Sequence, residues 1–251
     1  MPITTNREKT IARIFGTPLI IKGLTWLPVA QLVAWLGMSL LAGKRRPERT
    51  WAKNLGVGAL TMPVVLGSEW CHNLAHAAAA QAVQKPMDEL RIIGGMPRVV
   101  YYNIEDPSVT PRQHILRALG GPIFNALLLG LSWLLRTKTA PESLAREAAD
   151  VSVGTNLFLS SVSFLPIPII DGGPILKWSL VSRGLSPASA DSQLRKVNGA
   201  MGCGFIIATV AAFRKRHWLL GSLLAQFAVL AFAFAFGWLH ESRENELGMA
   251  R

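Results

Sequence analysis

The sequence contains few charged residues and very few cysteines. Charged side chains make up 16% of the 251 residues, and the two cysteines, Cys71 and Cys203, both lie within apolar segments. Their spacing fits neither a disulfide framework nor a cysteine-based zinc site. Acidic residues are scarcer than basic ones, 15 against 26, which gives a net charge of +11. This charge does not predict nucleic-acid binding, because the basic residues cluster in short segments beside apolar runs, where they face anionic lipid headgroups.

Apolar residues, by contrast, make up half of the chain and occur in long runs. Several of these runs approach or exceed the roughly 18–20 residues that span a bilayer. We therefore predict an α-helical integral membrane protein with about six transmembrane helices, forming one domain over residues 1–251 in contact with membrane lipid. The runs are 24–43, 54–67, 115–135, 151–176, 197–213 and 218–239.

Two segments between these runs predict a small β-sheet at the membrane surface. Residues 13–23 are short and β-branched, as in an interfacial strand, and 85–112 mixes glycine turns with β-branched and aromatic residues. A helix is expected over 54–84, and it contains the two histidines described below. A broken helix is expected over 151–183, because the prolines and glycines of "LPIPIIDGGP" cannot continue a regular helix. Such a break at membrane depth requires surrounding protein or a water-filled cavity.

Two histidines in the first of these helices are candidate metal ligands. In "HNLAH", His72 and His76 are four residues apart, so a helix places both rings on one face. This spacing suits two ligands on one zinc ion. The alternative is two histidines packed against neighbouring helices. Ionisable residues within a membrane span are costly and usually functional, which favours the metal.

Asp171 is the candidate third ligand. It is the one acid in its apolar run and lies in the break of that run. Burying an unpaired carboxylate is costly, and coordination of a cation removes that cost. Two histidines, one aspartate and an open position are typical of a catalytic zinc site, although such a set also serves iron. The alternative is a helix N-cap, with Asp171 accepting from amides near Gly173.

The order of these motifs resembles the site-2 protease family of intramembrane zinc metalloproteases. That family pairs H-E-x-x-H with N-x-x-P-x-x-x-x-D-G, and the chain has "HNLAH" followed much later by "SFLPIPIIDGGP". "ALGGPIFNALLLG" is similar to the family's A-G-P-x-x-N segment, and "FGTPLIIKG" is similar to its opening strand. The resemblance implies one zinc ion per chain, held by His72, His76 and Asp171.

The resemblance also implies a partner and a location. Members of the family cleave transmembrane proteins at a zinc site that is reached from the cytosolic side. We therefore expect a transmembrane protein as substrate or partner, and a cell-membrane protein whose termini and site opening face the cytosol. The charges of the loops alone leave this orientation undecided.

Two positions depart from the family pattern. Asn73 replaces the catalytic glutamate, and Ser163 replaces the asparagine of the second motif, whereas Pro166, Asp171 and Gly172 match it. An amide cannot take up and deliver the proton that hydrolysis requires, and loss of such a group slows a reaction roughly 10²–10⁴-fold. The retained ligands together with the altered helper positions predict a metal-binding pseudoprotease.

Other polar residues leave alternatives open. Glu69, one turn before Asn73, is a candidate surrogate base in an active protease, but its distance favours orienting a zinc-bound histidine or packing the helix. Asn125 and Asn156 line the substrate path, as the resemblance implies, or form an interhelical hydrogen bond. A metal-handling membrane protein is a third functional hypothesis, supported by the ligands alone.

Overall fold

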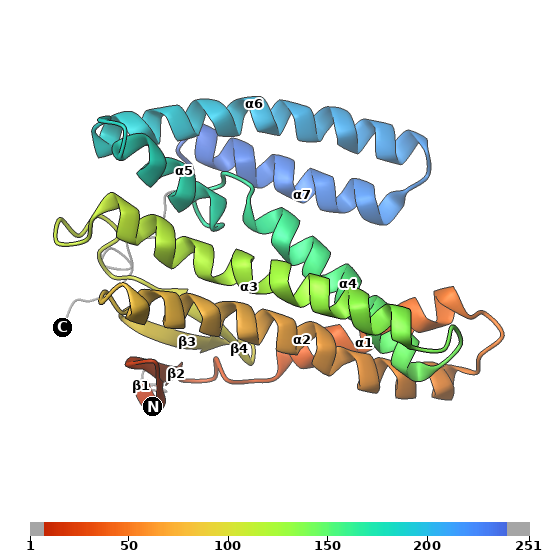
Figure 1. The fold of residues 1–251 in the computed structure, drawn as a ribbon. Helices are drawn as coiled ribbons and strands as arrows, with labels where there is room; N and C mark the ends of the chain where they lie inside the picture. Colours follow the sequence, from red (N-terminus) through yellow and green to blue (C-terminus); the bar gives the residue numbers. More distant parts are fainter. Residues whose placement is uncertain (1–7, 240–251) are drawn as a thin grey trace, which may run out of the picture. The chain divides into compact units, whose positions relative to one another are not determined.

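The structure, a computed structural model, describes residues 8–239, within which the chain forms seven helices and four short strands (Figure 1). The expected cytosolic termini lie outside these residues. The strands are β1 (Glu8–Ile14), β2 (Thr17–Lys22), β3 (Glu89–Ile93) and β4 (Met96–Val100). The helices are α1 (Val29–Arg45), α2 (Trp51–Ala82), α3 (Pro111–Lys138), α4 (Leu144–Ser163), α5 (Gly172–Val181), α6 (Pro187–Arg214) and α7 (Trp218–Ala235). The predictions of a mainly helical fold and a small sheet are confirmed.

The described residues form two compact units. Unit 1 contains the described residues up to Tyr101 together with Leu119–Ser161, and therefore holds the sheet, α1, α2, most of α3 and nearly all of α4. Unit 2 contains Tyr102–Ala118 and the described residues from Val162 onward, and therefore holds α5, α6 and α7. His72 and His76 belong to unit 1, and Asp171 belongs to unit 2.

The sheet of unit 1 packs against the second half of α2. Its strands lie in the order β1-β2-β3-β4, with an antiparallel hairpin at each end and a parallel pair in the middle. Ala77 and Ala80 of α2 are fully buried in one cluster with Leu19, Leu90 and Ile92 of the sheet. Small alanine side chains allow the strands to lie close to the helix, so the sheet fixes the segment of α2 that carries the histidines.

Helix α1 lies against the first half of α2 at a close contact between small residues. The fully buried Ser39 packs on Gly58, and a Cβ added at Gly58 would lie 2.0 Å from the Ser39 Oγ. The indole Nε1 of Trp35 donates to the Leu55 carbonyl at 2.9 Å, which joins the two helices one turn away. Glycine at position 58 is therefore required by the space between the helices, as is common where membrane helices approach closely.

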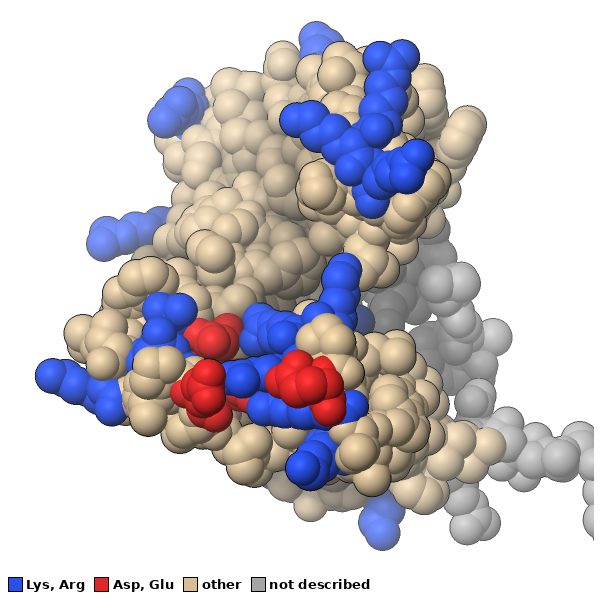
Figure 2. Space-filling view, turned by 90° about the vertical axis from the view of Figure 1, so that its right-hand side faces the viewer, with Lys and Arg blue, Asp and Glu red and all other residues tan. Residues whose placement is uncertain are grey.

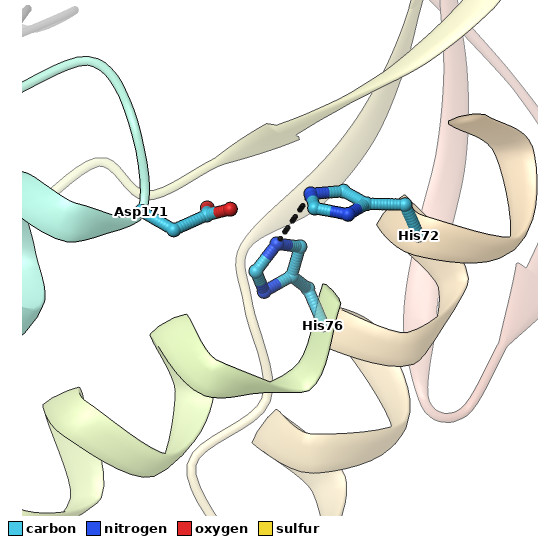
Figure 3. Close-up of side chains that lie close together, drawn as sticks. All are labelled: His72, His76 and Asp171. Carbon is cyan, nitrogen blue, oxygen red and sulfur yellow. Dashed lines mark hydrogen bonds between the residues drawn. The ribbon is translucent and has the colours of Figure 1, made fainter. Parts of the chain in front are cut away.

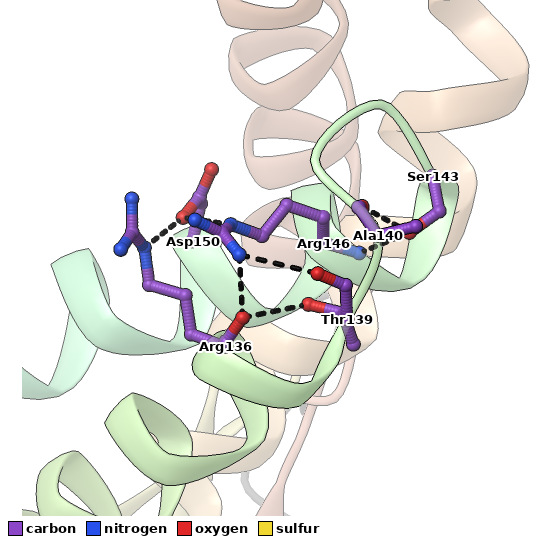
Figure 4. Close-up of polar contacts among 6 residues, drawn as sticks. All are labelled: Arg136, Thr139, Ala140, Ser143, Arg146 and Asp150. Atoms are coloured by element: carbon purple, nitrogen blue, oxygen red, sulfur yellow. Dashed lines mark hydrogen bonds and ion pairs between the residues drawn. The ribbon is translucent and has the colours of Figure 1, made fainter.

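Polar contacts around the α3–α4 turn fix the register of these two helices (Figure 4). The Arg136 Nε donates to the Asp150 carboxylate at 2.5 Å. Arg146 donates to the carbonyls of Arg136 and Thr139 at 2.6 and 3.2 Å, and so satisfies acceptors that the end of α3 leaves open. The antiparallel register that results places Asn125 of α3 opposite Asn156 of α4.

At the same end of unit 1, a salt bridge connects the turn between α1 and α2 with the start of α4. Arg49, before α2, forms a bidentate salt bridge with Glu147 in the first turn of α4. The hydrogen bonds from Arg49 hold the pKa of Glu147 below its ordinary value, against the opposing effect of partial burial. Figure 2 looks onto this end, where acidic side chains lie among basic ones. Basic residues thus gather at the end of apolar helices, as the sequence predicts.

Unit 2 contains the break between α4 and α5. Residues 164–171 form a tight turn. Gly172 and Gly173, at the start of α5, pack directly on the backbone of Phe164–Pro168. Asn198 of α6 donates to the Pro166 carbonyl at 2.7 Å and fastens this turn. The buried Lys177 of α5 donates to Glu105 at 2.7 Å and to Asp191 of α6 at 3.1 Å. These contacts fix the start of α5, where Asp171 lies.

Within residues 8–239, three helices are long and apolar enough to cross a membrane, namely α3, α6 and α7. Many of their large apolar side chains are exposed, for example Leu127 at 70%, Ile207 at 71% and Leu219 at 80%. Water would penalise such exposure, whereas lipid chains would not. These helices indicate a membrane protein. The expected total of about six spans is not established by them.

We expect Gly58→Ala to destabilise the packing of α1 on α2 by about 1–3 kcal/mol, because the added methyl group overlaps Ser39. Thermal unfolding in detergent measures this change. Gly56→Ala in the same helix is the matched control, because a Cβ there meets no atom within 4 Å. It should leave the melting temperature unchanged or raise it, since alanine favours helix by about 0.5–1 kcal/mol. Equal effects of the two variants would contradict this account of Gly58.

Candidate metal centre

The two histidine rings lie side by side on α2, with their Nε2 atoms toward each other (Figure 3). Their Nε2 atoms lie 3.1 Å apart, and the ring planes are inclined at 80°. His72 and His76 are 8% and 5% exposed, so both imidazoles are largely removed from solvent. The helix thus presents two buried nitrogen atoms side by side, each a possible electron-pair donor to a metal, as the spacing predicts.

The spacing of these donors fits a metal such as zinc. Two nitrogens bound at about 2.0–2.1 Å to a tetrahedral zinc ion lie about 3.3–3.4 Å apart. The observed separation of 3.1 Å is within a few tenths of an ångström of this value. The metal could therefore bind both nitrogens with little movement of either ring. Ordinary packing of two histidines does not require this separation of their Nε2 atoms.

A pair of glycines on α3 leaves room for the two rings. A Cβ added at Gly120 would lie 2.5 Å from the Ala75 carbonyl oxygen, so α3 contacts the α2 backbone between the histidines. A Cβ added at Gly121 would lie 2.5 Å from the Nε2 atoms of both His72 and His76. The amide of Gly121 also donates to His76 Nδ1 at 3.4 Å. Gly121 therefore keeps open the space between the donors, a role that the sequence analysis did not assign.

Asn125 of α3 contacts the other nitrogen of His72. Its Oδ1 forms a hydrogen bond with His72 Nδ1, and its Nδ2 donates to Asn156 Oδ1 at 2.7 Å. Both asparagines are fully buried. These are the interhelical hydrogen bonds that were one of the two interpretations of this pair. The partner that orients His72 is thus Asn125, whereas Glu69 contacts Asn73.

Asn73, next to His72, is bonded within its own helix. Its Nδ2 donates to the Glu69 carbonyl at 2.9 Å and lies 3.5 Å from the Glu69 carboxylate. Asn73 is 6% exposed, whereas Glu69 is half-buried. The carboxylate of Glu69 is therefore next to the side chain of Asn73.

Glu69 also lines a cavity of about 530 Å³ in unit 1. Helices α1, α2 and α4 and the edge strand β4 form its walls, and most of the wall is apolar. Its charged groups are Glu69 of α2, Arg98 of β4, Arg45 of α1 and Asp150 of α4. The volume lies in the range of roughly 300–1,000 Å³ that is typical of ligand sites in proteins.

The remaining candidate residues belong to unit 2. Asp171 directly precedes α5, and its side chain makes no capping hydrogen bond to that helix, in contrast to the N-cap alternative. Its backbone has helical dihedral angles, and Figure 3 shows its carboxylate extending away from α5. Ser163 is the buried last residue of α4, and the Pro166 carbonyl is bonded to Asn198.

Comparisons with known proteins identify the fold. The structure resembles that of the site-2 protease from Methanocaldococcus jannaschii, with a TM-score of 0.52 over 92% of this chain and 94% of that chain. The two sequences are 11% identical, so this likeness concerns the fold alone. No family model matches the chain. The chain therefore shares its fold with that structure.

A sequence match points to the same group of proteins. A curated protein of Methanocaldococcus jannaschii named "Putative zinc metalloprotease" is 35% identical over 83 residues. The match covers 33% of this chain and 42% of the relative, so the chain spans less than half of the relative's length.

We expect Gly121→Ala to abolish zinc binding, because the added methyl group would occupy the space between the two Nε2 atoms. Metal analysis of the purified variant after zinc loading and desalting measures this. Gly130→Ala, also in α3, is the matched control, because a Cβ there meets no atom within 4 Å. It should bind zinc as the native chain does. One zinc ion per chain in Gly121→Ala would contradict the site.

Proposed function

We propose that the protein is a zinc-binding member of the site-2 protease group that binds transmembrane polypeptides and hydrolyses them poorly or not at all. The observation that carries this proposal is the pair of buried histidines with an amide, Asn73, beside them. The site has the donors for a metal and lacks the carboxylate that the family places next to them.

One zinc ion per chain would be held by His72, His76 and Asp171. Each residue offers one ligand atom of a kind that zinc accepts. In support, the two imidazole donors have a suitable spacing, and the side chain of Asp171 does not cap α5. The zinc metalloprotease name of the matched relative is consistent with this choice of metal.

The residues beside the metal site limit its chemistry. When bound, zinc would polarise a peptide carbonyl and lower the pKa of water, but hydrolysis also needs a group that moves a proton to the leaving amine. Asn73 cannot do so, because its amide does not titrate and already donates to the Glu69 carbonyl. Ser163 has a shorter side chain than the family's asparagine and would reach less far toward a developing oxyanion.

The cavity and the edge strand β4 are the proposed binding surface. Met96 and Arg98 of β4 line the cavity, and β4 forms one edge of the sheet. An extended polypeptide could pair with β4 through its backbone and place apolar side chains in the cavity. An apolar transmembrane segment that is locally unwound has the chemistry that this surface requires.

Glu69 supports an alternative, an active metalloendopeptidase with a displaced base. Its carboxylate is 3.5 Å from the Asn73 amide and lines the cavity. In this alternative, Glu69 would take the proton through an intervening water. The role is less direct than that of a carboxylate at position 73, because Glu69 lies about 6 Å back along the helix axis.

The placement in the membrane is part of the proposal. Helices α1 and α2 and the broken pair α4 and α5 would add three spans to α3, α6 and α7, which gives six. The protein would lie in the cell membrane with its site opening toward the cytosol, as the family resemblance implies.

We expect Asn73→Glu to raise the rate of cleavage of a generic transmembrane substrate by roughly 10²–10⁴-fold, because it restores the acid–base group. Cleavage by the purified, zinc-loaded protein in detergent is followed on gels. The double variant His72→Ala, Asn73→Glu is the control and should be inactive.

The native chain is assayed beside Glu69→Ala to test the alternative. Efficient cleavage by the native chain that disappears in Glu69→Ala would show an active protease and overturn the pseudoprotease proposal. Native zinc content near one per chain without cleavage would support it.

A further inference from the structure

A buried chain of hydrogen bonds connects His72 to a backbone carbonyl through two asparagines. It runs from His72 on α2 to Asn125 on α3, then to Asn156 on α4, and from there to the Ser152 carbonyl and Ser68. All five residues belong to unit 1. Because Ser68 is on α2, one turn before His72, the contacts form a closed ring through three helices.

The orientation of the Asn156 amide is fixed by its acceptors. One side-chain atom of Asn156 lies 2.8 Å from the Ser152 carbonyl oxygen and 3.2 Å from Ser68 Oγ. A backbone carbonyl can only accept, and the Ser68 hydroxyl already donates to the Val64 carbonyl at 2.8 Å. The atom that faces both must therefore be the amide nitrogen, so Oδ1 faces Asn125.

The same reasoning carries over to Asn125. The atom of Asn125 that lies 2.7 Å from Asn156 Oδ1 must be a donor, hence Nδ2. The remaining atom, Oδ1, then faces His72 Nδ1 and can only accept. His72 must therefore carry a proton on Nδ1. In the neutral ring this leaves the lone pair on Nε2, the atom that faces His76.

We propose that Asn125 and Asn156 are positioning residues that fix the tautomer of His72 in which Nε2 can bind a metal. The Ser152 carbonyl orients the amide of Asn156, Asn156 orients the amide of Asn125, and the Oδ1 of Asn125 then accepts from His72 Nδ1. In metal sites, such partners of a ligand histidine orient the ring and raise its basicity. Here a relay of two amides takes the place of the usual carboxylate or single carbonyl. The proposal rests on the proposed role of His72 as a ligand.

The tautomer is measured on the metal-free full-length protein with ¹⁵N-labelled histidine, from the ¹⁵N shifts and two-bond ¹H–¹⁵N couplings of the imidazoles. His72→Gln assigns the signals. We expect the native His72 to have a protonated Nδ1 and an unprotonated Nε2. An unprotonated Nδ1 would overturn the proposal.

Variants separate the relay from general packing. Asn125→Leu and Asn156→Leu should each mix the two tautomers of His72, and Asn125→Leu should weaken zinc binding roughly 10–100-fold in a chelator competition. Asn125→Asp keeps the acceptor and should retain the protonated Nδ1. Asn54→Leu, at a buried asparagine of α2 outside the relay, should change neither readout.

The two proposals can fail separately. A native His72 tautomer that stays fixed in Asn156→Leu and Asn125→Leu would overturn the relay, whatever the zinc content. A tautomer that depends on both asparagines would support the relay even where the chain binds no zinc, and the absence of zinc would then count against the proposed function alone.

Discussion

The polar ring through His72, Asn125, Asn156 and Ser68 is the constraint on which the centre of unit 1 depends. Asn125 and Asn156 are fully buried, and a buried amide without partners costs about 1–3 kcal/mol. Each of these bonds joins two different helices, so all are satisfied only when α2, α3 and α4 hold one register. Apolar packing alone tolerates small sliding between helices, whereas this ring does not. The geometry of the histidine pair is thus coupled to the assembly of the helices.

Small residues then set how close the neighbouring elements come to α2. On the sheet side, Ala77 and Ala80 admit the strands. On the side of α3, Gly120 and Gly121 admit a helix backbone to the level of the histidine rings. Helix α2 is therefore held between the sheet on one side and Gly120 and Gly121 of α3 on the other. Its two imidazoles face a space that stays open because Gly121 has no side chain.

Much of the fold and the arrangement of the two histidines could be predicted from the sequence. The helical period places His72 and His76 on one face, and the prolines and glycines around Asp171 indicate the break, because these patterns depend on local geometry. The sequence could not identify the partner of each polar residue. Whether Asn125 would face a substrate or His72 depends on the register between α3 and α4, which is set by remote contacts such as Arg136 with Asp150. The role of Gly121 likewise depends on the approach of another helix.

The central claim is that two imidazoles and one carboxylate of this chain bind a single zinc ion. X-ray absorption at the zinc edge, on the purified full-length protein loaded with zinc, tests it most directly. We predict one zinc ion per chain, a first shell of nitrogen and oxygen without sulfur, and outer-shell scattering from two imidazoles that falls to one in His76→Ala. A chain that retains no zinc, or a spectrum without imidazole scattering, would contradict the claim.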